Sequence, residues 1–216
     1  TSLVLWGSRP CQMRALPPLP PRRHFDTSRT TLPSSTRLTA LAFLVYLPLG
    51  AIAVGWAELG QGRHAWALHR PLLESPYPSR LAISLALGAL LAGSVVAATP
   101  FLVERTSWAR GLRNELQPLV APLTPFGITI LALVSGVAEE LFFRGAMQPI
   151  LGLWWTSLIF GVLHTGPKWA LLAWSIWAFV MGLLFGWIFE CTGVLWGPML
   201  AHVWINQRNM TYIQRH

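Results

Sequence analysis

Residues 38–57, LTALAFLVYLPLGAIAVGWA, form an uninterrupted run without a charged side chain. At 1.5 Å per residue, a helix of this length spans about 30 Å, which is the thickness of the hydrocarbon core of a bilayer. A second uncharged run covers residues 81–103. The two runs predict membrane-spanning helices and therefore an integral membrane protein.

The composition of the whole chain favours the same class. Of the 216 residues, 53% are hydrophobic and only 11% are charged, whereas soluble domains contain roughly 25% charged residues. The net charge of +8 could indicate nucleic-acid binding, but the basic residues lie in short segments between long apolar runs. Loops that orient membrane proteins have this distribution. We therefore expect membrane lipids, and no nucleic acid, as partners.

The chain is expected to have three parts. Residues 1–37 contain six prolines and six arginines and predict a disordered or extended basic tail. Residues 38–118 hold the two spanning helices and, at residues 104–118, a loop or interfacial helix. Residues 119–210 are predicted to form a helical core in which ionisable residues interrupt the apolar runs, and this core should hold the chemistry of the protein. Its four helices are expected at residues 126–144, 151–164, 169–189 and 194–206. The predicted fold is all-α, a polytopic transmembrane bundle of about six helices.

The distribution of basic residues predicts the orientation of this bundle. With six crossings, one side of the membrane receives twelve basic residues and the other receives four. The positive-inside rule then places both termini in the cytoplasm. The membrane that we expect is the cell membrane, which is the inner membrane of a bacterium.

Charged residues interrupt an apolar run at residues 139–144, EELFFR. A charge at the centre of a bilayer costs roughly 2.5–3.5 kcal/mol, so these groups require partners, water or a boundary position. Glu140 and Arg144 are i,i+4 neighbours and can form an ion pair. Glu139 points about 100° away from Glu140 and remains available for another task. The alternative interpretation is a solvated Glu–Arg pair at a helix end.

Three further polar residues stand in apolar segments. His164 ends FGVLH, residues 160–164, and HVWIN, residues 202–206, places His202 and Asn206 one helical turn apart. Each has an ordinary explanation on its own, as a packed histidine or as an interhelical hydrogen bond. Together with Glu139, however, they are four polar groups on three apolar helices. The free-energy cost of facing lipid predicts that they meet in one wet pocket.

Such a pocket contains the groups that acyl transfer to water requires. Glu139 can act as a general base with His164 sharing the proton transfers, while His202 and Asn206 can donate hydrogen bonds to an oxyanion. No serine or cysteine is an obvious nucleophile. Ser135 lacks a surrounding GxSxG pattern, and Cys191 has no histidine within a helical turn.

The three motifs, EELFFR, FGVLH and HVWIN, resemble in this order the EExxxR, FxxxH and HxxxN motifs of the CAAX-processing and bacteriocin-processing (CPBP) intramembrane proteases. The resemblance covers about residues 119–210. It implies an all-helical membrane endopeptidase of the glutamic type, in which water attacks the scissile carbonyl. The substrates that it implies are prenylated C-terminal peptides, peptide precursors or C-terminal sorting tails.

The same resemblance implies a set of catalytic residues at the motif positions. These residues are Glu139, Glu140, Arg144, His164, His202 and Asn206. The first glutamate and the histidine of FGVLH would activate the water, and the second glutamate and the arginine would support that arrangement. The histidine and asparagine of HVWIN would form the oxyanion site. No cofactor is expected.

Two alternatives remain open at this point. Glu139, His164 and His202 can instead hold a zinc ion with an open position for water, although HExxH is absent and Asn206 is a poor fourth ligand. A non-enzymatic transport or immunity protein can use the same polar residues for a proton relay or for partner recognition. Transporters usually have two related halves, and the sequence has no internal repeat.

Overall fold

The computed structural model describes residues 34–68, 70–166 and 168–216. Most of the tail predicted at residues 1–37 therefore lies outside the described residues. Within them the secondary structure is helical, apart from one isolated β-bridge between Ala67 and Val194. The predicted all-α fold is confirmed.

The helices begin and end at residues that favour such boundaries. The side chains of Ser34, Thr106 and Thr124 each accept a hydrogen bond from a backbone N–H of the helix that follows them, as N-cap residues do. Gly193, with φ 65°, ends a helix in the left-handed conformation. The elements are α1 (Ser35–Gly55), η1 (Trp56–Gly60), α2 (Tyr77–Arg105), α3 (Ser107–Val120), α4 (Pro125–Glu140), η2 (Leu141–Met147), α5 (Gln148–Leu163), α6 (Trp169–Thr192) and α7 (Trp196–Arg215).

Four helical stretches are long and apolar enough to cross a membrane: Ser35–Gly60, Tyr77–Arg105, Pro125–Leu163 and Trp169–Thr192. The helices predicted at residues 126–144 and 151–164 both fall on the third stretch, which changes direction at Gly152 (φ 78°, ψ 169°). The helix predicted at residues 194–206 corresponds to α7, which is outside this set because its second half, NQRNMTYIQR, is polar.

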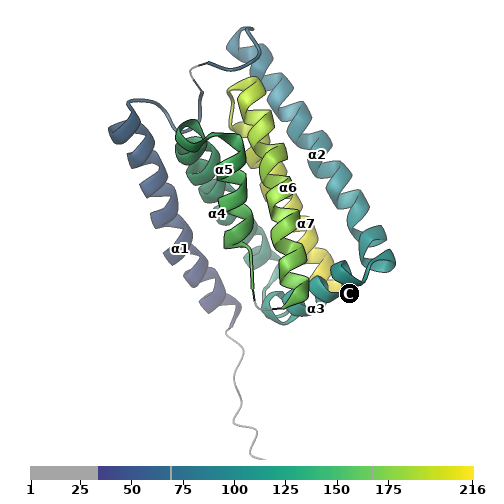
Figure 1. Cartoon of the computed structure of the whole chain (residues 1–216). Coiled ribbons are helices and arrows are strands. Elements are labelled where there is room, and N and C mark those ends of the chain that lie inside the picture. Colours follow the sequence, from purple (N-terminus) through teal and green to yellow (C-terminus); the bar gives the residue numbers. More distant parts are fainter. Residues whose placement is uncertain (1–33, 69, 167) are drawn as a thin grey trace, which may run out of the picture. The chain divides into compact units, whose positions relative to one another are not determined.

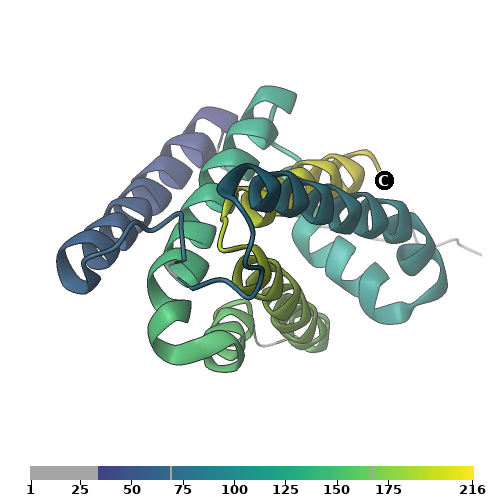
Figure 2. The same ribbon diagram turned by 90° about the horizontal axis from the view of Figure 1, so that it is seen from above.

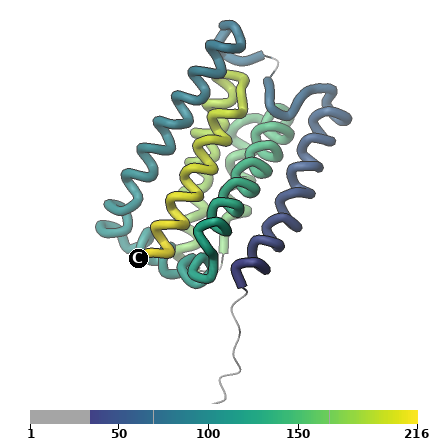
Figure 3. Tube along the Cα trace, turned by 180° about the vertical axis from the view of Figure 1, so that it is seen from behind, coloured from purple at the N-terminus to yellow at the C-terminus, as the bar shows by residue number. Residues whose placement is uncertain are grey.

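The long helices lie side by side in one bundle (Figures 1 and 3). α7 packs on both α2 and α4, α4 also packs on α1, and α5 packs on α6. The beginning of α1 and the C-terminus lie at the same end of the bundle (Figure 1), as an even number of crossings requires. Which end faces the cytoplasm stays a prediction.

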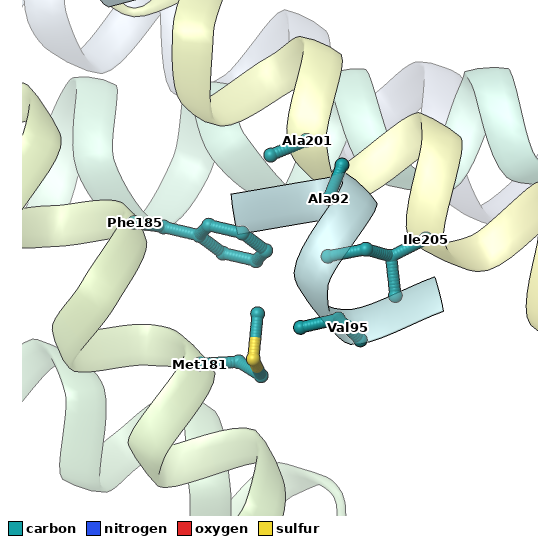
Figure 4. Packing of buried hydrophobic residues seen from close by; sticks show 6 residues of the cluster. All are labelled: Ala92, Val95, Met181, Phe185, Ala201 and Ile205. Atoms are coloured by element: carbon teal, nitrogen blue, oxygen red, sulfur yellow. The ribbon is translucent and has the colours of Figure 1, made fainter. Parts of the chain in front are cut away.

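Close packing around α7 fixes the helix that carries HVWIN. A Cβ on Gly88 of α2 would overlap the carbonyl of Gly197 in α7, so the two backbones touch. Ser84 Oγ accepts a hydrogen bond from Gly197 N at 3.2 Å and donates one to Val194 O at 2.8 Å. Further along, a buried apolar cluster joins α2, α6 and α7 (Figure 4). Its members are Ala92, Val95, Met181, Phe185, Ala201 and Ile205.

Candidate active site

The reversal at Gly152 brings the first two motifs together. Glu139 and His164 are twenty-five positions apart, which would separate them by about 37 Å along a straight helix. In the folded chain, His164 Nε2 lies 3.9 Å from Glu139 Oε2. The turn within Pro125–Leu163 is therefore what assembles this part of the site.

Glu139 lies close to two imidazole rings. His202 Nε2 is 3.8 Å from Glu139 Oε2, the same oxygen that lies 3.9 Å from His164 Nε2. Both separations exceed the length of a hydrogen bond, and Glu139 Oε2 is a buried oxygen without a hydrogen-bond partner among the described residues. One water oxygen can bridge separations of this size.

Glu140 points away from Glu139 into the protein. It is fully buried, and its Oε1 accepts hydrogen bonds from Arg144 Nη1 at 3.0 Å and from His202 Nδ1 at 2.7 Å. The i,i+4 ion pair that the spacing predicts is thus present. The guanidinium carbon of Arg144 lies 4.5 Å from the centre of the Phe160 ring, within the range of a cation–π contact. Glu140 and Arg144 therefore do not line the cavity. Glu140 holds His202 directly, and Arg144 holds Glu140.

The partners of the two histidines assign the positions of their protons. His164 Nδ1 lies 2.7 Å from the Phe160 carbonyl oxygen, which can only accept, so this nitrogen carries a hydrogen. The carboxylate of Glu140 assigns the hydrogen of His202 to Nδ1 in the same way. In their neutral forms both rings therefore present an unprotonated Nε2 towards Glu139. Donation from His202 to an oxyanion, which the sequence predicts, requires the imidazolium form.

Asn206 is held by a residue that the sequence analysis considered only as a nucleophile. Its Nδ2 donates to Ser135 Oγ at 3.2 Å, and Ser135 is buried one turn before Glu139. The second N–H of the Asn206 amide forms no hydrogen bond to a described residue. The sequence could have indicated this role, because Ser135 lies four residues before Glu139 and therefore on the same helix face.

Tyr46 of α1 is a site residue that sequence reasoning missed. Its hydroxyl lies close to the Glu139 carboxylate, and the residue lines the same cavity. Between Ala40 and Gly55 it is the only polar side chain. A lone hydroxyl in the middle of a spanning helix needs a polar partner, and that was the available signal.

A cavity of about 600 Å³ connects these groups. Glu139, His164, His202 and Asn206 all line it, so the structure brings together the four residues that were expected in one pocket. The remaining lining is mostly apolar and includes leucines of α1 and α3 and tryptophans of α6. Along α7 the lining extends from His202 to Ile213, a distance of about 16 Å.

The zinc alternative can be compared with this geometry. The Nε2 atoms of His164 and His202 and the carboxylate of Glu139 are donor types that zinc accepts. Within residues 34–68, 70–166 and 168–216, however, no group of three or more His, Cys, Asp or Glu side chains is spaced to hold a metal ion. As placed, the three donors do not fit a zinc site.

Comparison with known proteins identifies the segment that contains all three motifs. Residues 121–207 match the family model described as type II CAAX prenyl endopeptidase, Rce1-like. The chain is also similar to the uncharacterized protein YpbD of Bacillus subtilis (strain 168), with 43% identity over 77 residues, which are 35% of this chain and 39% of the relative. The chain thus spans about two fifths of the length of this relative. No solved structure matches. The family resemblance predicted from the motifs is confirmed for this segment.

Proposed function

We propose that the protein is an intramembrane endopeptidase that hydrolyses a peptide bond in a substrate presented from the membrane. The match of residues 121–207 to an endopeptidase family supports this activity. The observation that carries the proposal is the environment of Glu139. Its buried Oε2 has no hydrogen-bond partner among the described residues and lies 3.8 and 3.9 Å from two imidazole Nε2 atoms, in a cavity that all three residues line.

In the proposed reaction, Glu139 is the general base. A water molecule bonded to Glu139 and His164 attacks the carbonyl carbon of the scissile bond, and Glu139 takes the proton that the water loses. When the tetrahedral intermediate collapses, the C–N bond breaks and the proton passes to the leaving amide nitrogen. This role requires a base within hydrogen-bond reach of the water, which the position of Glu139 at the cavity wall supports.

The negative charge that develops on the carbonyl oxygen requires donors. Asn206 supplies a neutral amide whose other N–H bonds to Ser135. His202 supplies a second donor when its Nε2 carries a hydrogen, and its Nδ1 is held at 2.7 Å by the buried carboxylate of Glu140. Donors fixed in advance at such a position account for a large part of many enzymatic accelerations.

The cavity supports an apolar, membrane-presented substrate. Its volume of about 600 Å³ and its apolar lining are typical of sites that bury most of a ligand. We propose a lipidated C-terminus, a C-terminal sorting tail or a peptide precursor as the substrate. We further propose that the protein resides in the inner membrane of a bacterium with both termini in the cytoplasm, which reporter fusions at the C-terminus test.

The proposal has two alternatives. One is a zinc-dependent version of the same protease, which would require Glu139, His164 and His202 to move from the positions found here in order to hold the ion. Measuring the zinc content of the purified protein, and its activity after chelation, distinguishes the two. The other is a non-enzymatic immunity or transport protein, which would tolerate Glu139→Gln because that change keeps size and polarity.

The decisive experiment compares membrane-protein termini in cells that express the wild type, Glu139→Gln or Glu104→Gln, using terminal-peptide mass spectrometry. Glu104 is an exposed glutamate at the end of α2 that does not line the cavity, so its variant is a matched control. We expect new termini with the wild type and with Glu104→Gln, and none with Glu139→Gln. Identical termini in all three strains, with equal expression and insertion, would favour the non-enzymatic alternative.

A further inference from the structure

Arg63 is a buried cation in the connection between η1 and α2, outside the segment that matches the endopeptidase family. Only 8% of its surface is exposed. Its Nε donates to Gln61 Oε1 at 2.8 Å, its Nη1 to His64 O at 3.3 Å, and its Nη2 to Gly145 O. In the described part of the chain it forms no ion pair. Burying an unpaired cation is unfavourable, and these three bonds to neutral oxygens offset that.

The contact at Gly145 fixes η2. This π-helical segment follows α4 directly and contains Arg144, and π-helical turns occur frequently at functional sites. The next carbonyl along, Ala146 O, accepts a hydrogen bond from Gln61 Nε2 at 2.9 Å. Two side chains of the connection therefore hold two successive carbonyls of η2. In Figure 2 the connection passes over the green helical segments that include η2.

Gly145 allows the connection to approach this closely. A Cβ at this position would lie 2.5 Å from Ala65 O, so any larger residue would push the two segments apart. The backbone of the connection, and not only the Arg63 side chain, thus lies directly on η2.

η2 leads directly to the site through short contacts. Arg144, the residue before Gly145, donates to Glu140 at 3.0 Å, and Glu140 accepts from His202 Nδ1 at 2.7 Å. The other nitrogen of that imidazole faces Glu139 in the cavity. A displacement of η2 therefore reaches His202 through two hydrogen bonds between buried groups.

We infer that Arg63 is a positioning residue of the proposed peptidase: by holding the carbonyls of η2 it fixes Arg144 and, through Glu140, the imidazole of His202. The expected effect on turnover rests on the proposed function. Substituting a residue that orients the groups of a site without touching the substrate typically lowers activity by about 10–100-fold. Arg63 touches neither the cavity nor Glu139, so its removal should change kcat and leave KM nearly unchanged.

The test uses Arg63→Met, which keeps the length of the side chain without its donors, and Arg63→Lys, which keeps the charge. The matched control is Arg70→Met, because Arg70 is an exposed arginine of the same connection. For the full-length protein in detergent we expect Arg63→Met to lower kcat by about tenfold or more, Arg63→Lys to lower it less, and Arg70→Met to leave it unchanged. The combination of Arg63→Met with Arg144→Met should lose no more activity than Arg144→Met alone, because both act through one chain of contacts.

A second measurement does not depend on activity. Diethyl pyrocarbonate modifies accessible imidazoles, and mass spectrometry gives the rate for each histidine. We expect Arg63→Met to raise the rate at His202 several-fold while the rate at the exposed His216 stays within the range of the control. An unchanged rate at His202, or a kcat equal to that of Arg70→Met, overturns the inference. If the wild type cleaves nothing but the rate at His202 rises, the proposed function fails and the positioning role stands.

Discussion

The two adjacent glutamates are expected to respond in opposite ways to the same substitution. Glu139→Gln should abolish turnover and leave the free energy of unfolding nearly unchanged. Glu140→Gln should lower that free energy strongly, whatever it does to turnover. The reason is their different partners: Glu139 Oε2 forms no hydrogen bond to a described residue, whereas Glu140 Oε1 accepts from both Arg144 and His202.

The structure gives the size of the difference. Arg144 is 1% exposed, and Glu140 is its hydrogen-bond partner within the described residues, since its Nε and Nη2 have none. Removing one member of a buried ion pair costs about 3–5 kcal/mol because the other charge stays buried. The cation–π contact of Arg144 with Phe160 remains in the variant. For Glu139→Gln the side chain keeps its size and an acceptor oxygen for the nearby Tyr46 hydroxyl, so we expect a change within about 1 kcal/mol.

Unfolding of the purified variants in mixed micelles, followed by circular dichroism, measures both values. The control is the double variant Glu140→Gln with Arg144→Met. The double variant should lose less stability than the two single variants lose in sum, by at least about 2 kcal/mol. The reason is that the effects of substitutions at neighbouring residues in one network are not additive. Equal stabilities for the two glutamine variants, or additive losses in the double variant, would refute the assignment of Glu140 as the buried counter-charge.

Four other substitutions test the site and the packing around it. Asn206→Ala should lower kcat about 100-fold with little change in KM, as loss of an oxyanion donor does, and steady-state kinetics on an identified substrate checks this. Tyr46→Phe removes only the hydroxyl beside Glu139, so turnover should fall while the unfolding curve is unchanged; an unaltered kcat would contradict a role for this hydroxyl. Gly88→Ala should destabilise the fold by about 1–3 kcal/mol, because its Cβ would overlap a backbone carbonyl of α7. Gly93→Ala, on the same helix with nothing within 4 Å of the new Cβ, should raise the stability by up to about 1 kcal/mol.

The sequence predicted those parts of the fold that depend on local composition. The uncharged runs at residues 38–57 and 81–103 correspond to α1 and α2, because long apolar helices are determined by transfer from water to lipid. The segment predicted as a loop or interfacial helix at residues 104–118 is the helix α3, which begins after the N-cap Thr106. In each case the determining residues are neighbours in the sequence.

The reversal at Gly152 was not predictable in the same way. The sequence suggested a break after Arg144, where charged residues end, but the helical segments continue to Gly152. A positive φ favours glycine, yet the chain contains 18 glycines and nothing local marks this one. Likewise, the bond from Arg63 to the carbonyl of Gly145 joins residues 82 positions apart, and no pattern within either segment reveals it.

The consecutive glutamates show how the membrane shapes such a site. One turn of a helix cannot place two neighbouring carboxylates on the same face, so one of them must point into the packed interior. There it requires a counter-charge, which Arg144 provides one helical turn later and His202 provides from α7. Because Glu140 binds Arg144 Nη1 and His202 Nδ1, neither of these nitrogens bonds to Glu139, whose Oε2 lies at the cavity without a hydrogen bond among the described residues. A carboxylate in that position is available to accept a proton from water, and the buried pair behind it keeps it so.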